Sequence, residues 1–238
     1  MDLSNNKIDF STLTSSLQSD VLLQRLTQLN DNADRHSLAT LYFGSIECLE
    51  KWSNQWHELS TIDDTIQTES VRERLATEWL IQLFNTLFYN QRVVLARSES
   101  EPEYFPAKGN KPARIEFAHG FFASALHEIS HWCLAGDARR RLPDFGYWYA
   151  PDGRTAAQQQ AFERVEIKPQ ALECLFTLAC NRRFQVSQDN LFADFDTSGS
   201  TFAHDVYQQV ESYIAKPQTL PRDAKTLLGA LLSICIKA

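Results

Sequence analysis

The sequence predicts an α+β fold that is rich in helix and carries a small sheet. Apolar side chains recur at helical spacing over long segments, most clearly in residues 69–89 and 121–135. Two shorter segments, residues 92–96 and 113–117, have the apolar and β-branched composition that is typical of strands. A His-Glu-x-x-His pentapeptide at residues 127–131 falls within the second helical segment. Together these segments indicate a mixed fold in which helices predominate.

Length and composition indicate one domain with an appended helical segment. The chain has 238 residues, 43% of them hydrophobic and 22% charged, which is ordinary for a soluble globular protein. Residues 1–66 show helical spacing without a cluster of catalytic residue types, so we interpret them as a helical N-terminal extension of unknown role. A polar, acidic stretch at residues 60–64 precedes the metal-dependent catalytic domain predicted for residues 67–238. Within that domain a further helix is expected at residues 156–180, interrupted near Pro169.

Charge and apolar runs limit the classes of partner. The 23 Lys and Arg against 30 Asp and Glu give a net charge of -7, which argues against direct, broad binding of nucleic acid. No basic region followed by an apolar run opens the sequence, and the longest apolar run, residues 227–236, is too short to span a bilayer. The five cysteines are odd in number and lack a C-x-x-C pair, which indicates reduced and mostly buried thiols. We therefore expect a cytoplasmic protein with neither a nucleic-acid nor a membrane partner.

The His-Glu-x-x-His pentapeptide predicts a metal site. Residues four apart lie one above the other on a helix, so the imidazoles of His127 and His131 can share one metal ion. Glu128 projects close by, where it can orient a ligating histidine, position a substrate, or act as the general base of a hydrolase. The pattern arises by chance in about one chain in a hundred of this length. It therefore indicates a metal and leaves the reaction open, because proteases, nucleases and oxygenases all use histidine pairs.

An open catalytic site needs a third protein ligand, and two regions offer one. Asp137 follows the first histidine by ten residues, but the glycine turn that this spacing needs is displaced to Gly136. The other region is the helix predicted at residues 156–180, where spacings of three and four residues place a polar stripe on one face: Glu163, Glu166, Gln170 and Glu173. We favour Glu166, whose neighbours along the chain are apolar, and keep Glu163 and Asp137 as alternatives.

Several long and unusual strings resemble the elongation factor P hydroxylase family. They are FAHGFFASALHEISHWC (residues 117–133), DFGYWY (144–149) with PDGR (151–154), VEIKPQAL (165–172) and FQVSQDNL (184–191). The resemblance covers roughly residues 70–238 and does not extend to the first 65 or so.

The resemblance implies hydroxylation of a lysine of elongation factor P that already carries a β-lysyl group. It further implies a mononuclear Fe(II) site with O₂ as co-substrate, in which His127, His131 and one carboxylate are the ligands. Another divalent metal such as Zn²⁺ could occupy this site in purified protein. The implied fold is similar to that of the H-x3-H-x5-H endoribonucleases rather than to the jelly-roll oxygenases. That similarity favours Asp137 as the third ligand, whereas the string around Glu166 favours Glu166, which we retain.

A doubly cationic substrate side chain calls for carboxylates and aromatic faces. The loop that follows the motif helix offers both, and we predict that four of its residues bind the substrate: Asp144, Tyr147, Tyr149 and Asp152. The alternative is that the aromatic side chains of this loop belong to the core and that its Pro-Asp-Gly sequence forms a turn.

Two other functions compete with hydroxylation. The first is a zinc-dependent hydrolase, either peptidase or nuclease, with Glu128 as the general base. The second is a noncatalytic adaptor with a vestigial metal site. A hydroxylase needs O₂ and iron, a hydrolase is indifferent to O₂, and an adaptor survives loss of His131.

Overall fold

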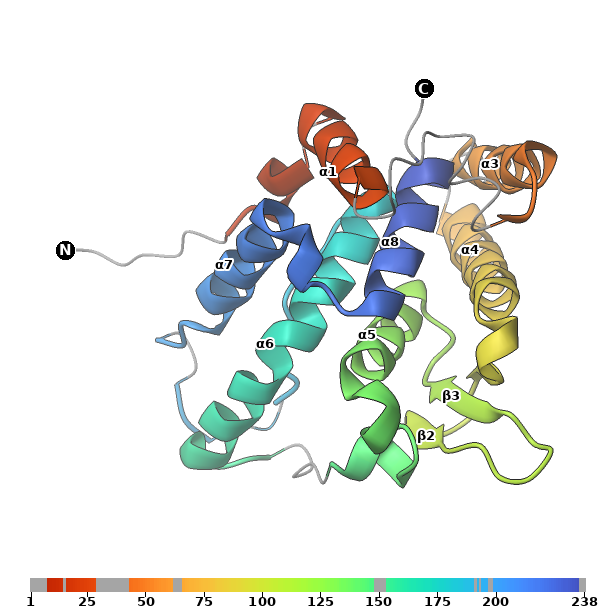
Figure 1. Cartoon of the computed structure of the whole chain (residues 1–238). Helices are drawn as coiled ribbons and strands as arrows, with labels where there is room; N and C mark the ends of the chain where they lie inside the picture. Colours follow the sequence, from red (N-terminus) through yellow and green to blue (C-terminus); the bar gives the residue numbers. More distant parts are fainter. Residues whose placement is uncertain are drawn as a thin grey trace.

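The computed structural model describes residues 8–14, 16–28, 43–61, 66–147, 153–190, 192, 194–196 and 199–235. Within these residues the chain is rich in helix and has one three-stranded sheet (Figure 1), which confirms the predicted class. The α-helices are α1 (Ser16–Gln28), α3 (Ile46–Ser60), α4 (Ile66–Leu87), α5 (Phe122–Arg139), α6 (Ala156–Ala179), α7 (Phe202–Ala215) and α8 (Arg222–Cys235). Short 3-10 turns are η1 (Phe10–Thr14), η2 (Tyr89–Gln91), η3 (Pro143–Gly146) and η4 (Pro217–Thr219).

The sheet has the strand order β1-β3-β2. The strands β1 (Val93–Arg97) and β3 (Ala113–Phe117) correspond to the two predicted segments and pair in parallel. The third strand, β2 (Glu103–Phe105), runs antiparallel to β3 and places Tyr104 opposite Ile115. It lies in a polar stretch whose composition does not predict a strand, and β3 supplies the hydrogen-bonding neighbour that a three-residue strand needs.

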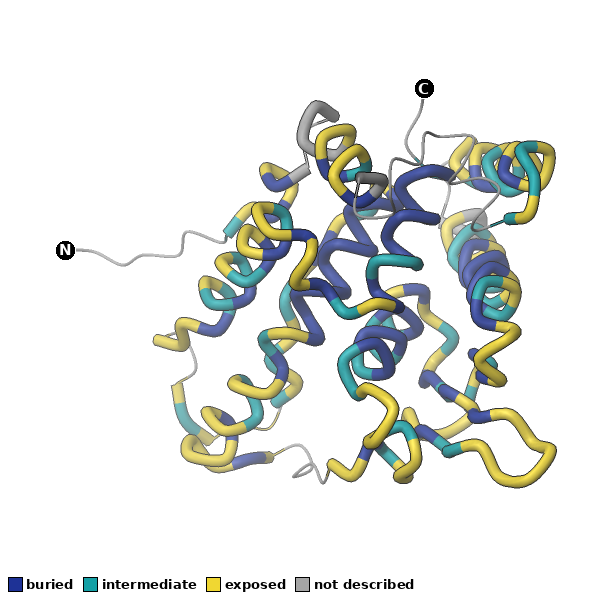
Figure 2. The backbone as a smooth tube through the Cα atoms, viewed as in Figure 1, coloured by how far each residue is buried: buried dark blue, intermediate teal, exposed yellow. Residues whose placement is uncertain are grey.

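The helix α5 lies at the centre of the arrangement. It packs against α6 on one side and against β3 and α4 on the other, while α7 packs on the far side of α6 (Figure 1). Buried residues gather where α5, α6 and α8 meet (Figure 2). The chain turns at Gly136, whose φ of 65° and ψ of 173° interrupt the helical backbone of α5 before its last few residues.

The predicted interruption of α6 near Pro169 is wrong, because α6 is continuous from Ala156 to Ala179. A proline inside a helix removes the hydrogen bond to the carbonyl four residues earlier, here that of Val165. The side chain of Val165 is 47% exposed, so water can hydrate this part of the helix. Every residue from 169 to 179 is buried, and this packing keeps the helix continuous past the proline.

The N-terminal helices share the hydrophobic core of the rest of the chain. Phe10, Leu22, Leu49 and Trp56 belong to the same buried cluster as the apolar residues of α5, α6 and α8. Both α1 and α3 pack against α8. The domain boundary at residue 66 stays a prediction. The described residues before it pack against the rest of the chain and share its hydrophobic core.

Other sequence-based expectations concern thiols and membranes. All five cysteines are free thiols, and Cys133, Cys174 and Cys180 are buried, as expected. None of the described helices is both long and apolar enough to cross a membrane.

A buried ion pair joins the end of α5 to the start of α8. The Nη2 atom of Arg140 lies 2.7 Å from Oδ2 of Asp223, with the two side chains 12% and 5% exposed. Arg140 also donates to the carbonyl of Trp132 and stacks on its ring at 3.6 Å. Burial would raise the pKa of Asp223, but hydrogen bonds from Arg222, Gln91 and Arg140 hold it below the usual value.

We predict that Asp223→Asn lowers the free energy of unfolding at pH 7 by about 3 kcal/mol, because it leaves the Arg140 charge buried without its partner. The folded-state pKa of Asp223 is depressed, so its stabilising contribution is present above the unfolded pKa of about 4 and is lost as pH falls through the folded pKa. Urea titrations at several pH values measure this. The wild type should lose stability on acidification more steeply than the variant, and parallel curves would contradict the prediction.

Candidate metal centre

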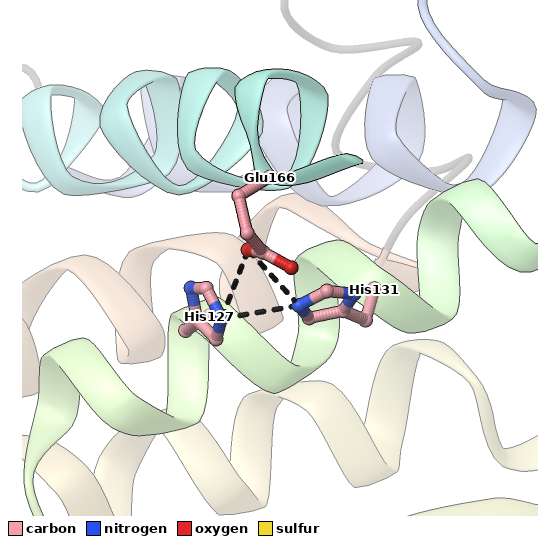
Figure 3. A group of neighbouring side chains, drawn as sticks. All are labelled: His127, His131 and Glu166. Carbon is pink, nitrogen blue, oxygen red and sulfur yellow. Dashed lines mark hydrogen bonds and ion pairs between the residues drawn. The ribbon is translucent and has the colours of Figure 1, made fainter. Parts of the chain in front are cut away.

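Two neighbouring helices bring three possible metal ligands together. His127 and His131 project from α5 toward α6, and Glu166 projects from α6 between them (Figure 3). The Nε2 atoms of the two histidines are 3.1 Å apart. The Oε2 atom of Glu166 lies 3.6 Å from Nε2 of His127 and 3.5 Å from Nε2 of His131. The three atoms form a nearly equilateral triangle.

This triangle has the dimensions of a metal site. Bonds of about 2.0–2.2 Å at angles of about 90–110° separate neighbouring ligand atoms by about 2.8–3.6 Å. The Oε2 atom of Glu166 is buried and has no hydrogen-bond partner within the described part of the chain. Such a buried polar atom costs at least about 1–3 kcal/mol unless something satisfies it. A cation bound to all three atoms would satisfy it, so the residues fit a metal ion.

Electrostatics favour a cation at the same place. Burial would raise the pKa of Glu166, but the charges of His131 and His127 lower it below the usual value, which keeps the carboxylate ionised. Burial lowers the pKa of His127, yet the hydrogen bond and charge of Glu173, with the charges of Glu166 and Glu128, raise it to about 10. The site therefore holds excess negative charge, which a proton or a divalent metal would balance.

Two further carboxylates border the triangle. The Oε2 atom of Glu173 lies 2.9 Å from Nδ1 of His127, the ring nitrogen that faces away from the triangle. Glu128 is half-buried on α5, and burial raises its pKa above the usual value, although the charges of His127 and His131 oppose this rise. Sequence analysis missed the contact of Glu173, although its spacing of seven residues from Glu166 places both on one face of α6.

The structure separates the alternative third ligands from the histidines. Asp137 is exposed beyond the turn at Gly136, and its charge acts on Arg222 instead. Glu163 accepts hydrogen bonds from Ser200 and Gln159. Neither carboxylate joins the group of possible ligands found among the described residues.

The predicted substrate-binding residues do not gather at the triangle in the described structure. Asp144 accepts a hydrogen bond from the backbone N–H of Tyr104 at 2.9 Å, so its carboxylate helps to hold β2. Tyr147 lies under the guanidinium of Arg139 at 4.1 Å and is 38% exposed. Tyr149 and Asp152 lie outside the described residues.

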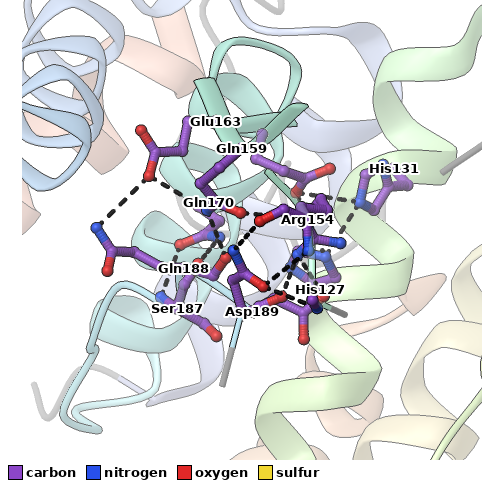
Figure 4. Close-up of polar contacts among 12 residues, drawn as sticks. His127, His131, Arg154, Gln159, Glu163, Gln170, Ser187, Gln188 and Asp189 are labelled. Carbon is purple, nitrogen blue, oxygen red and sulfur yellow. Dashed lines mark hydrogen bonds and ion pairs between the residues drawn. The ribbon is translucent and has the colours of Figure 1, made fainter. Parts of the chain in front are cut away.

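Amide side chains of α6 hold the irregular segment 182–190 beside the site (Figure 4). The Oε1 atom of Gln170 accepts from the backbone N–H of Ser187 at 3.0 Å, and its Nε2 donates to the carbonyl of Ser187 at 2.6 Å. The Nε2 atom of Gln159 donates to the carbonyl of Gln188 at 2.9 Å. The segment belongs to no helix or strand, so these side chains supply hydrogen bonds to backbone groups that secondary structure would otherwise satisfy.

Arg154 also binds the segment 182–190, and we call Arg154, Gln159 and Gln170 together the polar bracket. Arg154 is 3% exposed, its Nε donates to Gln159 at 3.0 Å, and its guanidinium stacks on Phe162 at 3.8 Å. Its Nη2 donates to the backbone carbonyl of Asp189. The charge of Arg154 also lowers the pKa of Glu166, so the bracket contributes to the field of the centre.

A helical histidine pair completed by a carboxylate from a second helix defines a candidate mononuclear metal protein. Over residues 83–236 the chain matches the family described as elongation factor P hydroxylase, EpmC. A Haemophilus influenzae protein named elongation factor P lysine hydroxylase is 47% identical over 162 residues, which cover 66% of this chain and 87% of that relative. The chain belongs to the elongation factor P hydroxylase family.

We predict that His131→Ala and Glu166→Ala each weaken binding of a divalent metal by more than about 100-fold, because a lost ligand costs more than a lost outer partner. Competition with a chromophoric chelator measures the dissociation constant. Glu163→Gln and Asp137→Asn are matched controls and should bind as the wild type does. Loss of affinity in Asp137→Asn instead would transfer the third ligand to Asp137.

The double hydrogen bond of Gln170 gives a local prediction. Gln170→Leu should lower the free energy of unfolding by about 1–2 kcal/mol, because it removes both partners of the Ser187 backbone. Hydrogen exchange at the Ser187 amide should become faster by about the same free energy. Gln160→Leu, an exposed position on the same helix, is the control. Unchanged exchange at Ser187 would show that the bracket does not hold this segment.

Proposed function

We propose that this chain hydroxylates the lysine side chain of elongation factor P that already carries a β-lysyl group. Family membership and the name of the Haemophilus influenzae relative, elongation factor P lysine hydroxylase, support this reaction and this protein partner. Within the chain the proposal rests on one observation, the triangle of His127, His131 and Glu166 around a buried carboxylate oxygen without a hydrogen-bond partner among the described residues.

We propose Fe(II) as the metal and O₂ as the co-substrate. Two imidazoles and one carboxylate are the donor set of non-heme Fe(II) oxygenases, and they leave coordination positions open. When bound, the iron would supply the oxidising chemistry toward an unactivated C–H bond that amino-acid side chains lack. The same donors also bind Zn²⁺, so purified protein could carry either metal.

The residues of the chain prepare the site for a cationic substrate. Glu166 is held ionised, and His127 and His131 present their Nε2 atoms to the centre. Glu128 is half-buried beside both histidines and feels the charges of Glu166 and Glu173. We propose that Glu128 binds an ammonium group of the substrate, because a half-buried carboxylate gains more from pairing with a cation than an exposed one does.

The loop after the motif helix, residues 144–152, contributes fewer substrate contacts to this proposal than the sequence predicted. The carboxylate of Asp144 is already used by the backbone of Tyr104. Tyr147 is 38% exposed but lies under the guanidinium of Arg139, and Tyr149 and Asp152 remain predicted substrate contacts. A substrate that is a translation factor favours a cytoplasmic location. The likeness to the H-x3-H-x5-H endoribonuclease fold remains part of the proposal and rests on the sequence resemblance.

The His-Glu-x-x-His motif supports a second candidate, a zinc-dependent hydrolase in which Glu128 activates water. The two functions differ in their need for O₂, and they differ in the product.

Mass spectrometry of β-lysylated elongation factor P tests the proposal. Incubation with the chain, Fe(II), a reductant and air should add one oxygen atom, and His127→Ala should abolish this gain. Glu128→Gln should lower kcat/KM by about 10- to 100-fold, mainly through KM, because a charge-assisted hydrogen bond contributes about 1.5–3 kcal/mol.

Two controls accompany this experiment. An anaerobic incubation should give no product, and Glu163→Gln should retain wild-type activity because its carboxylate is engaged with Ser200. If the wild-type chain adds no oxygen with Fe(II), the hydroxylase proposal fails and the zinc hydrolase becomes the leading candidate.

A further inference from the structure

Glu173 contacts the candidate centre from outside the triangle of ligands. It lies on α6, two turns after Glu166, with its side chain 12% exposed. Its Oε2 atom is 2.9 Å from Nδ1 of His127, whose Nε2 faces His131 and Glu166. The Nδ1 atom of His127 therefore meets the outer carboxylate of Glu173, whereas its Nε2 atom belongs to the triangle.

This division determines which nitrogen can bind a metal. A neutral imidazole has one N–H and one bare nitrogen, and an ionised carboxylate can only accept. A hydrogen bond between Nδ1 and Glu173 therefore requires the proton on Nδ1. The lone pair is then on Nε2, the atom that points into the triangle. Carboxylates that contact a ligating histidine in this way fix the tautomer and ring orientation and make the imidazole a better donor.

The geometry points to Glu173 as the positioning residue of His127, acting through the Nδ1 hydrogen bond. The inference rests on the metal centre of the proposed function, but it does not depend on the reaction that the metal performs. Glu173 lies outside the group of possible metal ligands and, in this inference, acts through the His127 ring.

A purely structural role for Glu173 predicts a different effect of its substitution. If Glu173 only joined α6 to α5, its loss would lower the stability of the metal-free protein and leave the intrinsic metal affinity alone. Metal affinity and the state of the His127 ring are therefore the decisive readouts, and thermal unfolding of the metal-free protein is the companion measurement.

The experiment titrates Zn²⁺ against a competing chelator in the full chain and in Glu173→Ala, Glu173→Gln and Glu163→Gln. Glu173→Ala should weaken Zn²⁺ binding by about 10- to 100-fold, as expected for loss of an outer-shell partner. Glu173→Gln should lose less, because its amide oxygen still accepts from Nδ1–H, although more weakly than a carboxylate. Glu163→Gln lies on the same helix without contacting His127 and should bind as the wild type does.

Proton NMR of the Zn²⁺-loaded proteins adds a readout that stability alone would not move. The wild type should show a slowly exchanging Nδ1–H resonance of His127, shifted downfield by the carboxylate. The resonance should move upfield in Glu173→Gln and exchange rapidly in Glu173→Ala. Should Glu173→Ala fail to fold, Glu173→Gln decides the matter through both measurements. Wild-type affinity and an unmoved resonance in Glu173→Gln, together with wild-type affinity in any folded Glu173→Ala, would overturn the inference.

These outcomes are separable from those of the hydroxylation assay. A wild type that transfers no oxygen, with Glu173→Ala impaired in Zn²⁺ binding, would end the proposed function and support the inference. A wild type that hydroxylates, with both Glu173 variants binding Zn²⁺ normally, would do the reverse. A wild type that binds no divalent metal would overturn both.

Discussion

The structure depends on the burial of one carboxylate between two helices. Glu166 is 1% exposed, and its Oε2 atom lies within 3.6 Å of the Nε2 atoms of both His127 and His131. An ionised group at such a depth is unfavourable without positive charge nearby, which a protonated histidine or a bound divalent cation would supply where α5 contacts α6. The contact between these two helices and the candidate metal site therefore involve the same three side chains.

The rest of the fold keeps α5 in place around these donors. At its start, the backbone N–H of Phe122 donates to Oε1 of Glu73 on α4 at 2.8 Å. Near its end, Arg140 pairs with Asp223 of α8. Both attachments use carboxylates from other helices, and β3 packs along the same helix. A helix fixed at both ends holds its central histidines within the narrow limits that a metal site requires.

The polar side chains along one face of α6 make three kinds of contact. Its amides, Gln159 and Gln170, hold the irregular segment beside the site. Glu166 faces the two histidines, and Glu173 meets the outer nitrogen of His127. The remaining faces of the C-terminal half are buried, which explains how a helix with this many polar residues stays in the core.

The sequence alone determined the features that depend on neighbours along the chain. Helical spacing placed His127 and His131 on one face, and the same periodicity placed Glu163, Glu166 and Glu173 on another. Strands β1 and β3 were also predictable from local composition. The motif spacing indicated a metal site, and the resemblance of the longer strings to a known family implied a hydroxylase.

Only the tertiary structure decided which of these groups meet. In the folded chain Glu166 lies beside the two histidines, whereas Asp137 is exposed beyond the turn at Gly136. The carboxylate of Asp144 accepts a hydrogen bond from the backbone of β2. The tertiary structure also paired Glu173 with His127 across 46 positions of sequence. The physical reason is that spacing within a helix determines a face, whereas contact between faces depends on how distant segments pack. The continuity of α6 through its proline has the same origin, because burial of the following residues outweighs the lost hydrogen bond.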